Sequence, residues 1–103
     1  MSTYFLVHLQ LPTAPDHLAE AHASGTLFLN ARGRACEAAR AAKLESEELA
    51  RALLTACAAP LASRYGDGVS MEVRRASVDG ADDAQQIAND SNDTRLWLAS
   101  QPA

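Results

Sequence analysis

The chain has 103 residues, of which 48% are apolar, and it carries a formal net charge of −4. Alanine fills 22 of the apolar positions, so Leu, Ile, Val and Phe together number only 20, which suffices for one thin core and excludes a second domain within residues 1–103. No apolar run approaches the roughly 18 residues of a membrane span, and the acidic balance disfavours sequence-independent binding to nucleic acid or anionic membranes.

The N-terminal part of the chain predicts two strands. Residues 4–11 place apolar side chains at every second position, which is typical of a strand with one wholly apolar face. Two prolines follow and end that strand. Residues 14–23 fit either a short helix or a loop. Residues 26–31 favour a second strand with Leu27 and Leu29 turned inward.

A long helical segment is predicted next. Residues 34–59 contain almost only good helix formers and neither glycine nor proline. Ser46 precedes two glutamates, the pattern of an N-cap and a first helical turn, so the region can also hold two helices separated near residues 44–45. Pro60 predicts a kink or a restart, and Gly66 predicts the C-terminal end of the helix.

The C-terminal part predicts two more strands with an acidic loop between them. Residues 69–78 alternate apolar and polar side chains, which indicates a strand with one face in water. Residues 79–94 hold five aspartates, no base and one large apolar residue, Ile87, so they predict a mobile loop, with a helical turn around residues 82–88 as an option. Residues 95–100, R-L-W-L-A-S, alternate again and predict a last strand.

Together these elements predict a two-layer α+β fold. A long helix packs on one face of a four-stranded antiparallel sheet, in the order strand, strand, helix, strand, strand, with an optional short helix after the first strand. Because the core is thin, we expect aromatic side chains on the outer sheet face to complete their burial against a partner or in a homodimer. The candidates are Trp97, Tyr4 and Phe28.

Charge is unevenly distributed along the chain. Residues 67–93 hold seven acids and two bases, whereas residues 32–64 hold six bases and four acids. The acidic part is suited to dock onto a protein partner with a basic surface through long-range attraction. In the basic part, three arginines are suited to hold an anion or an acidic partner, or form a solvated face. The acidic candidates are Asp79, Asp82, Asp83, Asp90 and Asp93, and the basic ones are Arg32, Arg34 and Arg40.

A small-molecule pocket is the alternative. His8 lies in the middle of the first strand, where an imidazole can serve as a general base near neutral pH. A pocket between helix and sheet would be lined by His8, Tyr4 and Arg74. The histidines lack the spacing of metal ligands. Cys36 and Cys57 are each expected in an alanine-rich helix, away from a helix N-terminus or sharp turn that could activate a thiol, so no metal, cofactor or catalytic residue is expected.

Two local resemblances accompany these patterns. The opening segment F-L-V-H-L-Q-L-P, residues 5–12, resembles the first strand of small dimeric α+β barrel proteins such as muconolactone isomerase. The layout of strands around a central helix, with L-W-L-A at residues 96–99, is similar to small phage-encoded proteins that include anti-CRISPR inhibitors. The first resemblance implies a dimeric enzyme or ligand-binding protein, and the second implies a protein-binding inhibitor.

The leading hypothesis is a small acidic, non-enzymatic protein that docks onto or occludes a protein partner, as inhibitors, immunity proteins and phage accessory factors do. A small dimeric α+β enzyme or ligand-binding protein is the alternative. Because there is no signal peptide and only two cysteines, expected to stay reduced, the protein is expected to act in the cytoplasm.

Overall fold

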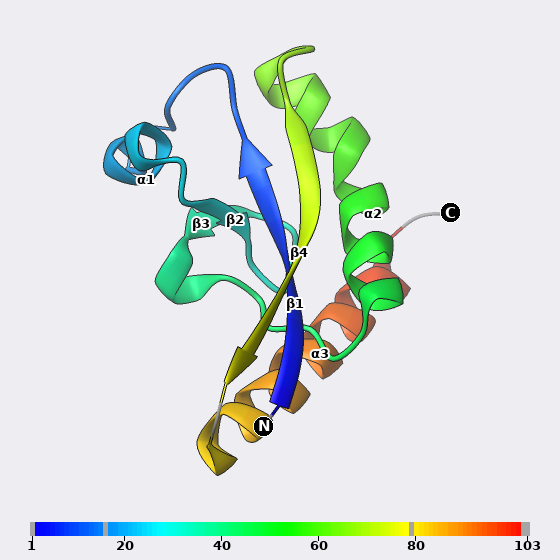
Figure 1. Ribbon diagram of the computed structural model, residues 1–103. Coiled ribbons are helices and arrows are strands. Elements are labelled where there is room, and N and C mark those ends of the chain that lie inside the picture. The colour runs from blue at the N-terminus through cyan, green and yellow to red at the C-terminus, as the bar shows by residue number, and fades with distance from the viewer. Residues whose placement is uncertain (1, 16, 79, 102–103) are drawn as a thin grey trace.

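The computed structural model describes residues 2–15, 17–78 and 80–101 (Figure 1). The strands form one antiparallel sheet in the order β3-β2-β1-β4. This confirms the predicted α+β fold with a four-stranded antiparallel sheet. The elements are β1 (Ser2–Gln10), α1 (Ala19–Ser24), β2 (Leu27–Leu29), β3 (Ala35–Glu37), the 3-10 turn η1 (Ala38–Arg40), α2 (Glu47–Tyr65), β4 (Ser70–Val78) and α3 (Ala81–Ser100).

The core lies between the sheet and α2. In β1 the odd-numbered side chains, among them Val7 and Leu9, point to this layer, as the alternating pattern predicted. From α2, Leu53 and its neighbours one turn away complete the layer, and each fully buried Leu contributes about 1.5–3 kcal/mol of burial free energy. The buried core comprises Val7, Leu9, Leu11, Leu18, Leu27, Leu29, Ala42, Leu44, Ala50, Leu53, Cys57 and Leu61.

Helix α2 begins where its capping residue predicted. The Ser46 side chain accepts a hydrogen bond from the Leu49 backbone N–H at 3.1 Å, and two glutamates occupy the first turn. Gly66 follows the last helical residue, also as predicted. The helix does not restart at Pro60, because α2 continues through it as one helix. Cys57 and Leu61 on either side of the proline are buried, so packing compensates for the one lost backbone bond.

The predicted helix over residues 34–46 is wrong, since β3, η1 and an extended segment occupy it. The Asn30 side-chain oxygen accepts bonds from the N–H groups of Arg32 (2.9 Å) and Arg34 (3.1 Å), which closes a tight turn. Gly33 supplies the left-handed φ of +74° that this turn requires. The turn folds β3 back onto β2, so strand pairing overrides the helix propensity of the alanines.

Helix α3 replaces the predicted loop over residues 79–94 and the predicted strand over residues 95–100. The sheet therefore takes its additional strand from β3 and not from the C-terminus. One side of α3 carries the buried residues Ile87, Ser91 and Thr94, which are four and three positions apart and thus share one helical face. Most of this face is polar, so apolar periodicity could not reveal it.

Polar side chains attach α3 to the extended segment before α2. Asp90 accepts a hydrogen bond from the Lys43 backbone N–H at 3.0 Å, and Ser91 accepts one from the Glu45 N–H at 3.0 Å. Thr94 donates to the Ala31 carbonyl at 2.9 Å. These bonds satisfy backbone groups that neither a helix nor a strand would satisfy, so α3 has a structural function.

We expect Asp90→Ala to lower the free energy of unfolding by about 1–3 kcal/mol, because the partly buried Lys43 N–H loses its acceptor. The matched control is Asp93→Ala, an exposed position on the same helix, which should change stability by less than about 0.5 kcal/mol. Urea denaturation followed by circular dichroism measures both. Equal stability of the two variants would contradict this role of Asp90.

Candidate functional site

Two of the five aspartates proposed for docking contact Lys43 within the molecule. Asp83 lies 3.5 Å from the Lys43 ammonium, and Asp90 binds the Lys43 backbone. Asp93 is exposed. Asp79 lies outside the described residues, and Asp82 is placed only by its backbone in α3. Two carboxylates are thus engaged within the molecule.

The three aromatic candidates lie in different places. Trp97 belongs to α3 and packs against the core, so its expected position on the outer sheet face is wrong. A Cβ atom on Gly33 would lie only 2.9 Å from the Trp97 ring, so this turn is in close contact with α3. Tyr4 and Phe28 lie on β1 and β2 at register positions that face away from α2 and α3. The three do not form one interface.

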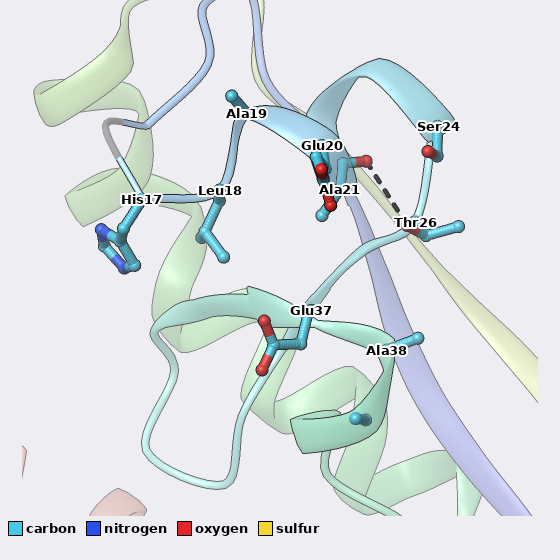
Figure 2. Close-up of a pocket in the computed structure, with 10 residues that line it drawn as sticks. His17, Leu18, Ala19, Glu20, Ala21, Ser24, Thr26, Glu37 and Ala38 are labelled. Atoms are coloured by element: carbon cyan, nitrogen blue, oxygen red, sulfur yellow. Dashed lines mark hydrogen bonds between the residues drawn. The ribbon is translucent and has the colours of Figure 1, made fainter.

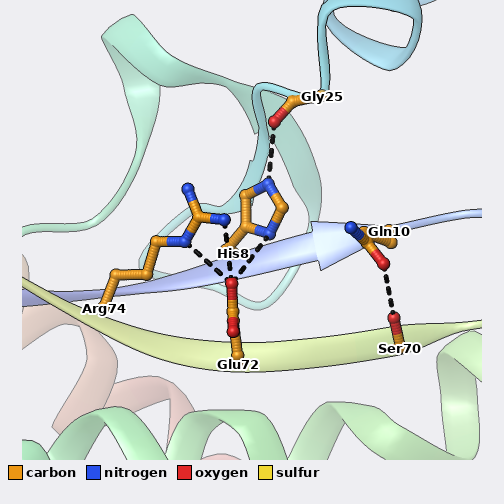
Figure 3. Close-up of polar contacts among 6 residues, drawn as sticks. All are labelled: His8, Gln10, Gly25, Ser70, Glu72 and Arg74. Carbon is orange, nitrogen blue, oxygen red and sulfur yellow. Dashed lines mark hydrogen bonds and ion pairs between the residues drawn. The ribbon is translucent and has the colours of Figure 1, made fainter.

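His8 lies on the sheet face opposite α2 and α3, where Figure 3 shows its neighbours above the strands. The ring is 2% exposed. Its Nε2 donates to the Gly25 carbonyl at 2.8 Å, and its Nδ1 lies 3.7 Å from the Glu72 carboxylate. Arg74 contacts the same Glu72 oxygen through Nε at 2.9 Å and Nη2 at 2.8 Å. The Phe28 ring meets the imidazole edge-on, 5.3 Å between centroids.

The alternative pocket of His8, Tyr4 and Arg74 is therefore assembled in part. His8 and Arg74 meet at Glu72, but on the sheet face away from the long helices rather than between helix and sheet. Tyr4 lies further along β1, with the Lys43 ammonium 5.4 Å from its ring centroid. Beside His8 is a hollow of about 250 Å³ lined by His8, Gln10, Ser70, Met71 and Glu72.

His8 fastens the end of α1 to the sheet. We expect His8→Leu to lower the free energy of unfolding by about 1–2 kcal/mol, since the Gly25 carbonyl loses its donor. Gln10→Leu is the control on the same strand face, where an exposed bond to Ser70 is lost and a smaller change should follow. Thermal and urea denaturation compare the two, and a fully stable His8→Leu protein would contradict the structural role.

Both cysteines are buried free thiols. Burial raises the pKa of Cys36 to about 12, with a further increase from Glu37 and a decrease from Arg40. Burial alone raises the pKa of Cys57 to about 11. Each thiol donates to a backbone carbonyl, Cys36 to Phe28 and Cys57 to Gly33. The geometry agrees with the structural role expected from the sequence.

Alkylation tests this role. Because the reactive thiolate forms only as the pH approaches the raised pKa values, iodoacetamide at about pH 8 should label both cysteines much more slowly in the folded protein than in concentrated urea. Peptide mass spectrometry resolves the two sites. Rapid labelling of Cys36 in the folded protein would contradict burial as the controlling factor.

Within residues 2–15, 17–78 and 80–101, no three His, Cys, Asp or Glu side chains are grouped so that they could hold a metal ion. No helix in this part of the chain combines the length and the apolar character needed to cross a membrane.

A concave surface lies along β3, and we call it the β3 groove. It consists of two adjoining hollows of about 520 and 360 Å³ that share His17, Leu18 and Glu37. One wall is β3 with η1, and the other is the segment from His17 into α1. Figure 2 shows Leu18 facing Glu37 across the larger hollow.

The edge of the sheet along this groove has free backbone groups. β3 is the last strand on its side of the sheet, and only β2 pairs with it among the described residues. The Asn30 N–H donates to the Arg34 carbonyl at 2.9 Å, so these two residues form a hydrogen-bonded pair next to the β2–β3 ladder. Since bonded and non-bonded pairs alternate in an antiparallel ladder, Cys36 faces β2 while the N–H and C=O groups of Ala35 and the N–H of Glu37 point away from it; the Glu37 carbonyl begins η1.

The charged side chains along the groove are unevenly placed. Arg34 and Arg40 line the smaller hollow, Glu20 lines the larger one, and Glu37 lines both. Arg40 is paired with Glu37 at 3.3 Å, and both side chains are exposed. Of the arginines singled out from the sequence, two thus border the groove. His17, Leu18 and the free edge of β3 were not anticipated, because a contact between α1 and β3 follows from strand pairing and not from any local motif.

Comparison with known proteins gave no relative: no protein-family model, no curated protein and no solved structure matches the chain. The local resemblance at residues 96–99 relied on a tryptophan in a last strand, whereas this segment is helical. The segment at residues 5–12 does lie in a strand over residues 5–10.

Proposed function

We propose that the chain is a non-enzymatic protein-binding module that holds an extended segment of a partner protein in the β3 groove. The observation that carries the proposal is the unpaired edge of β3 beside a groove whose opposite wall is α1 and the segment before it. This keeps the leading hypothesis of a docking protein. It moves the docking surface away from the aspartates, because Asp83 and Asp90 contact Lys43.

Strand addition explains how such a groove would bind. An extended peptide beside β3 would exchange backbone hydrogen bonds with Ala35 and accept one from the Glu37 N–H, while its alternate side chains enter the two hollows. Backbone bonds give affinity without regard to sequence, and the hollows give specificity. Each backbone bond contributes about 0.5–1.5 kcal/mol net, so a few bonds with side-chain burial correspond to a Kd on the order of micromolar.

The remaining expectations about partners stay proposals. We propose that the partner is met in the cytoplasm, since two buried free thiols with raised pKa suit a reducing compartment. The homodimer and the partner with a basic surface remain predictions that no contact described above supports. The hollow beside His8 is smaller, and its polar groups Gln10 and Ser70 are bonded to each other.

A proline at the free edge tests the proposal. Glu37 has φ −76° and ψ 166°, which a proline adopts without strain, and its N–H points away from β2. Glu37→Pro should therefore preserve the fold, remove one outward donor and obstruct the added strand. The matched control Glu37→Gln removes the side-chain charge but keeps the N–H.

The probes are two bead libraries of random octapeptides, one attached through the N-terminus and one through the C-terminus. We expect the wild-type protein and Glu37→Gln to select the same peptides, with Kd values within about threefold, and Glu37→Pro to bind them at least about tenfold more weakly. Circular dichroism confirms that each variant is folded. If neither library yields a binder, or if Glu37→Pro binds as tightly as Glu37→Gln, the proposed function is wrong.

A further inference from the structure

Beyond the two hollows of the β3 groove lies a third, of about 270 Å³, at the C-terminal end of α2. It joins the groove because His17, Leu18, Arg34 and Ala35 line both this hollow and the smaller hollow of the groove. Its far wall is formed by residues near the end of α2, among them Leu61, Arg64 and Tyr65. Arg34 and Arg64 thus border one continuous depression from two different elements.

The cations at this end contrast with the acids at the other. Within the part of the chain that the structure describes, no ion pair engages Arg34 or Arg64, whereas Arg40 is paired with Glu37. The Arg64 guanidinium carbon lies 5.5 Å from the Tyr65 ring centroid, a contact that helps to hold it at the hollow. Glu20 borders only the larger hollow at the opposite end, and Glu37 lines both hollows of the β3 groove. Neither acid lines the third hollow, where Arg34 and Arg64 are the charged side chains.

We propose that the extended segment bound in the β3 groove carries a carboxylate, and that Arg34 and Arg64 bind this carboxylate in the third hollow. This inference rests on the proposed function. A guanidinium offers two parallel N–H groups that match the two oxygens of a carboxylate. The apolar side chain of Leu61 and the Tyr65 ring form part of the same wall, and such surroundings strengthen a charged hydrogen bond by displacing water.

The two arginines differ in whether they also stabilise the fold. Arg64 lies in the last turn of α2, where a cation also interacts favourably with the negative end of the helix dipole. Arg34 precedes β3 and has no such helix to stabilise. A substitution of Arg34 therefore separates a loss of ligand binding from a loss of fold stability better than a substitution of Arg64 does.

The carboxylate has two sources, an Asp or Glu side chain or the C-terminus of the partner chain. The two bead libraries separate them, because only the library attached through its N-terminus has free C-terminal carboxylates. Selected peptides are then resynthesised in three forms: unchanged, with Asp and Glu replaced by Asn and Gln, and with an amidated C-terminus. Fluorescence anisotropy gives the Kd of each form.

The protein variants are Arg34→Gln and Arg64→Gln, with Arg51→Gln as the control. Arg51 is also on α2, but it is exposed and paired with Glu47 at 3.1 Å, away from the groove. We expect one of the two carboxylate replacements to weaken binding about tenfold, and Arg34→Gln to weaken the unchanged peptide by a similar factor. Arg34→Gln should weaken the binding of the neutral peptide only slightly further, as expected when Arg34 and the peptide carboxylate interact with each other.

The outcomes distinguish the two proposals. Peptides that require an intact β3 edge but bind equally well without any carboxylate would overturn this inference and leave the proposed function standing. The same holds if Arg34→Gln binds like Arg51→Gln. Failure of both libraries to yield a binder would remove the proposed function and this inference with it.

Discussion

The extended segment over residues 42–45 is the constraint on which the rest of the molecule depends. Its N–H groups point alternately to two sides, as in a strand. Those of Ala42 and Leu44 donate to carbonyls of the sheet, at Leu29 and Phe5, with distances of 3.1 and 2.8 Å. Those of Lys43 and Glu45 point the other way and would be unsatisfied without the side chains of α3. Helix α3 thus takes the place of a neighbouring strand, and its inner face must be polar.

This constraint explains which parts of the fold the sequence could predict. β1 and β4 pair over nine residues and place apolar residues at every second position along much of their sequences, and Ser46 caps α2 by a local bond, so all three were predictable. The helix over residues 81–100 was not. Its acids and hydroxyls looked suited to water, whereas Ser91 is fully buried against a backbone group contributed from 46 positions earlier in the chain. No local pattern encodes such a partner.

The candidate site, too, could be predicted from the sequence only in part. Arg34 and Arg40 were recognised as a basic cluster from their spacing alone. The groove that they border exists only because Asn30 and Gly33 turn β3 onto β2 and because His17 and Leu18 lie opposite, a relation between three separate stretches of the chain. For the predicted acidic surface, the sequence showed the charges but not their contacts. Sequence reveals where charge lies along the chain, but Lys43 decides which carboxylates remain available to a partner.

The shortness of β3 has a consequence for self-assembly. An exposed sheet edge is a template on which strands can stack without limit, and proteins with long free edges tend to polymerise. Here the regular edge spans three residues, since the turn at Gly33 bends the chain at one end and η1 bends it at the other. A guest strand finds few backbone partners and must gain the rest of its affinity from side chains in the hollows. The short edge therefore disfavours fibril growth by copies of itself, whereas the proposed guest would add the contacts of its side chains in the hollows.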